Sequence, residues 1–170
     1  MTSIQVCALP EHALLRKYVG AGAYTDCHMT ELAWPVSQPE FIEAFYTTAL
    51  FKVERLLLSW FVARPSTDSQ AAQLASGQVG SFAMWRVEAR EPDQLLMCDL
   101  NARTRSWLMS ASFADGQSTR LFFGSAVVHV IDRRTGTAQT GIAFRALLGF
   151  HKLYSRALLR AAVARLARRA

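Results

Sequence analysis

The chain has 170 residues, of which 51% are hydrophobic and 19% charged, and its formal net charge is +6. This length fits one domain with a sizeable core, and the composition excludes a disordered or low-complexity chain. The positive charge raises the question of nucleic-acid binding, so its distribution matters. The last eleven residues hold Arg160, Arg165, Arg168 and Arg169, where a helix C-terminus favours cations by about 0.3–1 kcal/mol each. We therefore expect a solvated helix end and no nucleic-acid partner.

The cysteines and the N-terminus predict the compartment. Cys7, Cys27 and Cys98 are odd in number and widely spaced, so neither a disulfide framework nor a zinc knuckle is indicated. Charged residues interrupt the segment from Met1 to Val19, which lacks the apolar core of a signal peptide. The longest apolar run is shorter than the ~18 residues of a membrane span. We expect a cytoplasmic protein without a membrane span.

The first half of the chain predicts an N-terminal extension, a strand and two helices. Residues 1–22 form the extension, and residues 24–34 read as the first strand. The run Ser37-Gln-Pro-Glu40 has the form of a capping box and predicts a helix start. A second helix follows Thr67, and Gly77 stands where a helix-ending glycine is preferred. Residues 37–77 therefore hold two helices, with a break expected near Ala49.

From Gly80 the hydrophobic period changes from 3.6 to 2, which predicts an antiparallel meander over residues 80–131. Its clearest strand, Thr104–Phe113, alternates between serines and large apolar residues. We predict that the apolar set faces the final helix and the serine set faces outward: Trp107, Met109, Ala111 and Phe113 against Ser106, Ser110 and Ser112. Asp115-Gly116 predicts the hairpin turn to the next strand.

Residues 141–169 predict one long amphipathic helix. Apolar residues recur at steps of three and four, at Leu147, Phe150, Tyr154, Leu158 and Ala161. Such a stripe requires a sheet to cover. The predicted fold class is α+β: a curved antiparallel sheet of about five to six strands wrapped against the C-terminal helix, in a single domain of residues 1–170.

This order of elements resembles the START-like helix-grip superfamily, also called SRPBCC. Three segments carry a closer resemblance to a bacterial family of unknown function within or near it: Gly22-Ala-Tyr24-Thr-Asp26, Val127-Val-His129, and Phe150-His151-Lys152-Leu153-Tyr154-Ser-Arg156. The resemblance implies a helix-grip fold with a cavity between sheet and long helix. It implies no established activity.

No motif for catalysis, metal or cofactor binding stands out. His12, His28, His129 and His151 lack the short spacings of zinc ligands, and we expect no metal or cofactor. There is no nucleophile elbow and no phosphate-binding loop. Catalytic residues therefore stay unassigned.

The inward face of the sheet is the remaining candidate site. We predict that a small apolar or amphiphilic molecule binds there, lined by Trp85, Val87, Trp107, Met109, Phe123, Leu147, Phe150, His151 and Tyr154. Arg105 shares the predicted inward face. It is either a polar anchor for an acidic ligand, the partner of Asp99 or Glu88 in a salt bridge, or exposed at the end of the strand.

Two other functions compete with this prediction. One is a cyclase- or hydrolase-like enzyme in the same cavity, using His151, Asp26 or Tyr154 as acid or base. The other is an interaction module whose basic C-terminal helix docks an acidic partner. The sequence predicts no oligomeric state.

Overall fold

The computed structural model describes residues 3–51, 67–128 and 142–169, and the side chains of the last helix only from Leu153 onward. The elements run in the order β1 (Gln5–Val6), α1 (Arg16–Gly20), β2 (Tyr24–Leu32), α2 (Gln38–Tyr46), α4 (Asp68–Ala75), β3 (Ser81–Phe82), β4 (Trp85–Glu91), β5 (Gln94–Asp99), β6 (Thr104–Ser112), β7 (Thr119–Val127) and α5 (Ile142–Leu166).

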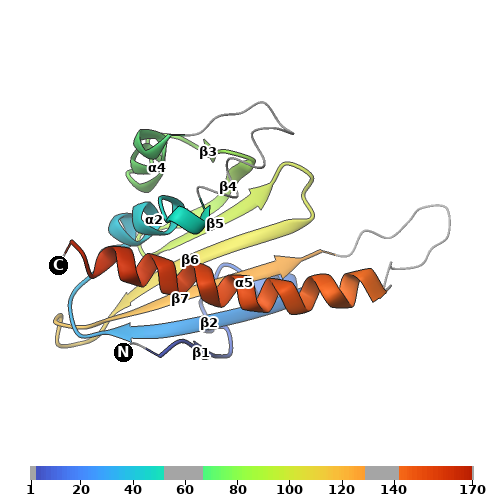
Figure 1. The fold of residues 1–170 in the computed structure, drawn as a ribbon, viewed down its shortest axis with the longest axis horizontal. Helices are drawn as coiled ribbons and strands as arrows, with labels where there is room; N and C mark the ends of the chain where they lie inside the picture. The colour runs from blue at the N-terminus through green and yellow to red at the C-terminus, as the bar shows by residue number, and fades with distance from the viewer. Residues whose placement is uncertain (1–2, 52–66, 129–141, 170) are drawn as a thin grey trace.

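One antiparallel sheet organises these elements. Its strand order is β1-β2-β7-β6-β5-β4-β3, and α2, α4 and α5 lie over one side of it (Figure 1). We call this side the helical face and the other the N-terminal face, because residues preceding β2 pack on it. The α+β class and the C-terminal helix are as predicted, and the arrangement is compatible with a helix-grip fold. The described sheet has seven strands instead of five to six, because β1 and β3 have two residues each and show no readable period.

The helix starts follow the predicted capping chemistry. Ser37 accepts a hydrogen bond from the Glu40 backbone, and the Glu40 side chain returns one from Ser37. Thr67 and Gln70 repeat the arrangement at the start of α4. The chain leaves the helical conformation after α2 and resumes it at residues 49–51, near the expected break.

The predicted strand from Gly80 to Ala89 is interrupted and bulged. Ala83 adopts a φ of 52°, so the chain turns there and separates β3 from β4. The pairing of β4 with β5 then shifts between Val87 and Ala89. Trp85 and Val87 pack on the helical face, whereas Ala89 joins the opposite one. A bulge inserts one residue and so reverses the alternation.

Strand β6 is antiparallel to β7, as predicted, but its faces are reversed. Leu108 belongs to the cluster under the helices, and Trp107 and Met109 belong to the cluster on the N-terminal face. The prediction that Trp107 and Met109 face the final helix is therefore wrong. Ser110 and Met109 are both buried, at 7% and 2% exposed, because both faces of this strand are covered.

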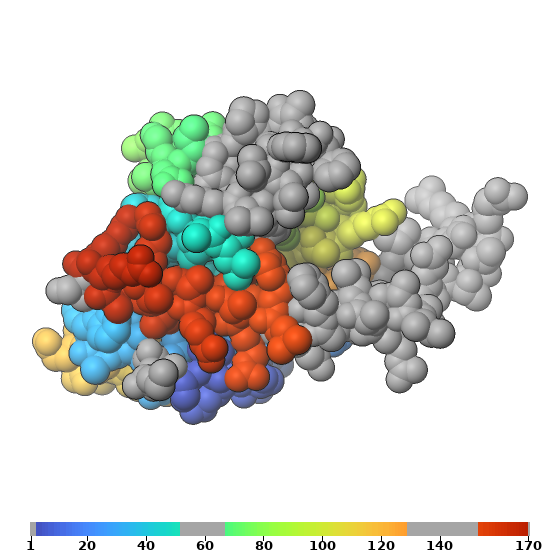
Figure 2. Space-filling model, viewed as in Figure 1, coloured from blue at the N-terminus to red at the C-terminus, as the bar shows by residue number. Residues whose placement is uncertain are grey.

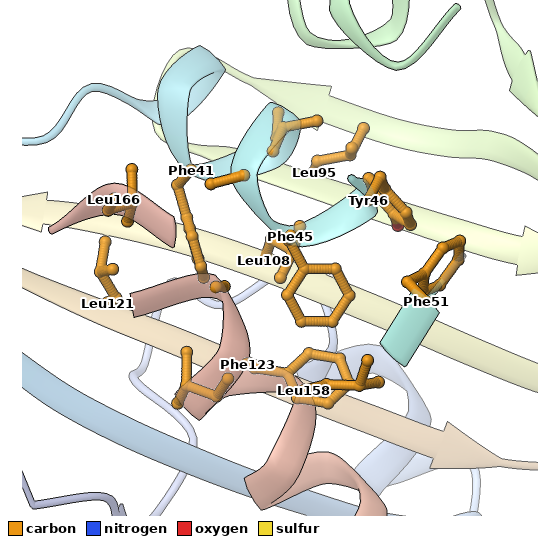
Figure 3. Packing of buried hydrophobic residues seen from close by; sticks show 14 of the residues in the cluster. Phe41, Phe45, Tyr46, Phe51, Leu95, Leu108, Leu121, Phe123, Leu158 and Leu166 are labelled. Atoms are coloured by element: carbon orange, nitrogen blue, oxygen red, sulfur yellow. The ribbon is translucent and has the colours of Figure 1, made fainter. Parts of the chain in front are cut away.

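The main core lies between the helices and the sheet. Phe45 contacts Phe41, Tyr46, Phe51 and Phe123, and Leu158 of α5 closes the cluster from the other side (Figure 3). The space-filling view shows α2 and the end of α5 lying against each other over the sheet (Figure 2). Leu158 is buried as predicted; the side chains of Leu147 and Phe150 lie outside the described residues. Within the described chain, no helix combines the length and hydrophobicity that a membrane crossing needs.

Candidate functional site

A cavity of about 210 Å³ lies between the sheet and the helices, at the place predicted for a ligand. Strands β4, β6 and β7 supply one wall and α2 and α5 the other. The described lining mixes aromatic rings with hydroxyl groups: Phe45, Phe51, Met84, Trp85, Thr104, Arg105, Ser106, Phe123, Ser125, Tyr154, Ser155 and Leu158.

The polar part of the wall is a row across three neighbouring strands. Ser125 of β7 stands opposite Asp26 of β2 on one side and opposite Ser106 of β6 on the other. The backbone N–H of Ser125 donates to Asp26 Oδ1 at 3.1 Å, and the Ser125 hydroxyl bonds to the same oxygen. The helical face is therefore polar at this end although it is covered. Asp26 is thus linked to the cavity by its hydrogen bonds with Ser125, a lining residue.

Two polar atoms of the lining residues are buried without a hydrogen-bond partner in the described part of the chain. They are the indole nitrogen Nε1 of Trp85 and the hydroxyl oxygen of Ser155. Ser155 is 0% exposed. A buried polar group left unsatisfied costs about 1–3 kcal/mol, so a bound molecule that formed a hydrogen bond with either atom would gain affinity.

The residues predicted for the site divide between the two faces. Trp85, Phe123 and Tyr154 line the cavity. Val87 packs on the same face against the core cluster. Trp107 and Met109 lie on the other side of the sheet.

Three further predicted residues, Leu147, Phe150 and His151, have side chains outside the described residues, and His129 lies outside them altogether. None of the three cavity serines, Ser106, Ser125 and Ser155, was predicted to belong to the site. Leu108, the one apolar residue among the serines of β6, was the available signal that the serine face is covered.

Arg105 lines the cavity, but its guanidinium is held in an ion pair. Its Nε lies 2.6 Å from Glu88 Oε2 and 2.7 Å from the Tyr18 hydroxyl, and its guanidinium stacks 4.7 Å from the centre of the Tyr18 ring. Arg105 therefore forms the salt bridge with Glu88 that was one of its predicted roles, and its charge is paired in the structure.

The ion pair controls the titration of Glu88. Burial raises the pKa of this carboxyl, but hydrogen bonds from Lys17 and Tyr18 and the charge of Arg105 outweigh burial and hold the pKa below its usual range. A carboxyl with a lowered folded-state pKa stabilises the fold above its unfolded pKa, about 4.3, and loses that contribution as the pH falls through the folded value.

Glu88→Gln is therefore expected to destabilise the protein by about 1–3 kcal/mol at pH 7, since a charged hydrogen bond contributes on that order. It should also reduce the loss of stability on acidification below about pH 4.3. Urea unfolding at pH 7 and in acid measures both effects, with Glu11→Gln, an exposed glutamate, as control. Equal losses of stability in acid for wild type and Glu88→Gln would contradict the assignment.

Within the described residues, no three His, Cys, Asp or Glu side chains are grouped to hold a metal ion. His28 is buried on β2, two positions from Asp26 on the same face.

Comparisons with known proteins show a structural likeness but no family. No protein-family model matches the chain, and no curated protein matches it. The crystal structure of CalU16 from Micromonospora echinospora is similar over 97% of this chain and 92% of that one, with 14% sequence identity and a TM-score of 0.33.

Proposed function

We propose that this protein binds a small uncharged molecule in the cavity between the sheet and α5. The observation that carries the proposal is the cavity itself, an apolar aromatic space of about 210 Å³ in which Trp85 and Ser155 keep buried polar atoms without described partners. Apolar pockets with a few convergent polar groups are the usual form of small-molecule sites. The order of elements further supports a helix-grip protein of the START-like type.

The cavity volume limits the size of the ligand. Sites for drug-sized molecules measure about 300–1,000 Å³, and an apolar cavity of about 150 Å³ accepts benzene. A space of about 210 Å³ therefore fits one substituted ring or a chain of similar volume. The Trp85 N–H can donate only, and the serine hydroxyls can donate or accept, so the preferred ligand carries an oxygen acceptor. Because the Arg105 charge is paired with Glu88, we propose neutral ligands before carboxylates.

We test the proposal with a matched pair of probes, 4-methylphenol and 1,4-dimethylbenzene, titrated by calorimetry. The phenol should bind more tightly, and Ser155→Ala or Ser106→Ala should weaken it by about 2–10-fold, the contribution of one hydrogen bond, with little effect on the hydrocarbon. Ser112→Ala is the control, because Ser112 lies on the same strand as Ser106 but is exposed. No binding of either probe, or an equal effect of Ser112→Ala, would refute the proposal.

A cyclase- or hydrolase-like enzyme in this cavity is the alternative. Tyr154 lines the cavity, and Asp26 is hydrogen-bonded to Ser125, another lining residue. Tyr154 and Asp26 are both acid-base groups in principle. Chemical change of a bound molecule, absent in Asp26→Asn, would favour this alternative. The third candidate is an interaction module that docks an acidic partner through the basic C-terminal helix. Arg169, which follows α5, already forms an ion pair with Glu43 of α2.

A further inference from the structure

Cys7 and Cys27 face each other at the edge of the sheet. Cys7 directly follows β1, and the pairing of Val6 with His28 places Cys27 opposite Cys7. The Cys7 backbone N–H donates to the Cys27 carbonyl oxygen at 3.0 Å. Their sulfur atoms lie 3.3 Å apart, and both thiols are free.

This position allows a covalent bond between the two sulfurs. Residues directly opposite each other in antiparallel strands have Cα atoms about 4.5–5.5 Å apart, within the roughly 4.4–6.8 Å that disulfides span. The sulfurs, 3.3 Å apart, would have to approach to the roughly 2.05 Å of an S–S bond. The third cysteine, Cys98, lies on β5 with Arg86 beside its sulfur and is 0% exposed.

The pair is open to small molecules from one side. A hollow of about 410 Å³ lies between the N-terminal segment and β2, and both cysteines line it together with Arg16 and Val19. Cys7 is half-buried, whereas Cys27 is 2% exposed. An incoming reagent therefore meets Cys7 first.

The environment of Cys7 favours its thiolate, the form that attacks. The hydrogen bond with Cys27 lowers the pKa of Cys7, burial opposes this, and the charge of Arg120 lowers it further. The same hydrogen bond and burial raise the pKa of Cys27. The greater exposure of Cys7 on the hollow points the same way, so we expect Cys7 to attack first and Cys27 to follow.

We propose that Cys7 and Cys27 form a thiol–disulfide exchange site that reacts with low-molecular-weight disulfides. The Cys7 thiolate, whose proton has gone to solvent, attacks one sulfur of glutathione disulfide. The S–S bond of that reagent breaks, and one glutathione thiolate leaves and takes up a proton from solvent. The Cys27 sulfur then attacks Cys7 in the mixed disulfide and expels the second glutathione thiolate, which takes up the Cys27 proton. The two cysteines are oxidised by two electrons, and one glutathione disulfide is reduced to two glutathione molecules.

The bridge would tie the N-terminal segment to the sheet. It closes a loop between positions 20 apart in the chain, and this loop contains Leu15 and Tyr18, which pack on the N-terminal face. Closing a loop of this length removes conformational entropy from the unfolded chain. The oxidised protein should therefore melt roughly 5–10 °C above the reduced protein.

The test incubates the folded protein with mixtures of glutathione disulfide and glutathione, quenches with acid, blocks remaining thiols and maps the peptides by mass spectrometry. Wild type and Cys98→Ser should both lose the mass of two hydrogen atoms and yield a linked Cys7–Cys27 peptide. Cys27→Ser should stop at glutathione bound to Cys7, and Cys7→Ser should leave Cys27 reduced.

The wild-type map alone decides the proposal, even where a variant fails to fold. A persistent mixed disulfide on wild-type Cys7, or oxidation of Cys98 as fast as Cys7, would overturn the exchange site. A linked peptide with an unchanged melting temperature would overturn the proposed effect on the N-terminal segment.

Discussion

Replacing Leu158 with alanine is expected to lower the free energy of unfolding by about 2–5 kcal/mol, the range for large-to-small changes in a core. Leu158 is 4% exposed and belongs to the cluster that joins α5 to α2 and the sheet. Figure 3 shows it against Phe123 of β7 and below Phe45 of α2. The truncation removes apolar contacts from three elements at once, and the rings around it are too rigid to fill the space fully.

The matched control is Leu153→Ala, five residues earlier on the same helix. Leu153 is 69% exposed, so its truncation should change stability by less than about 0.5 kcal/mol. Reversible urea unfolding measures both variants. A loss below about 1 kcal/mol for Leu158→Ala, or equal losses for the two leucines, would show that this face of α5 does not hold the helix on the sheet.

The elements that the sequence predicted well are those decided by local chemistry. The Ser37–Glu40 capping box and the Thr67 cap depend on residues three positions apart, so their signal is complete within a few residues. The long amphipathic helix and the β6–β7 hairpin at Asp115-Gly116 are also local patterns. Such local patterns predict the same element whatever the arrangement of the rest of the chain.

The choice of face on β6 depends on the whole chain. Period 2 separates Trp107 and Met109 from Ser106 and Ser110 but does not say which set meets the helices. The larger set was assigned to the core on the assumption that one face is solvated, and the N-terminal segment covers that face instead. Gly124 of β7 is a marker of this cover, since an added Cβ would lie 2.9 Å from Leu15 and 3.0 Å from Trp107.

The candidate site was likewise only partly predictable from the sequence. Its position between sheet and helix followed from the order of elements, and Trp85, Phe123 and Tyr154 were identified as residues on that side. Ser106 was predicted to face outward with the other serines of its strand, and Ser125 and Ser155 were not singled out. A polar row such as Asp26-Ser125-Ser106 is visible only once three strands are paired. The ion pair of Arg105 with Glu88 was predicted as one alternative, because an apolar interior requires a charge to be paired.

Gln94 of β5 connects the N-terminal segment to the sheet by hydrogen bonds. No structural role was predicted for it from the sequence. Gln94 is 0% exposed. Its side-chain oxygen accepts from the backbone N–H of Leu14 and from the indole N–H of Trp107, both at 2.9 Å. Its amide nitrogen donates to the His12 carbonyl oxygen at 3.1 Å. One buried amide thus serves both the segment and the large aromatic residue beneath it.

Gln94→Ala is therefore expected to destabilise the protein by about 2–5 kcal/mol, because each buried group that loses its partner costs about 1–3 kcal/mol and the costs are not fully additive. Urea unfolding measures the loss of stability. In hydrogen exchange, the variant should exchange faster than wild type at Leu14 and its neighbours, with a smaller change in α5. Gln117→Ala, at an exposed glutamine, should change neither. A loss below about 1 kcal/mol, or unchanged exchange at Leu14, would mean that apolar packing alone holds the segment and that the amide of Gln94 is dispensable.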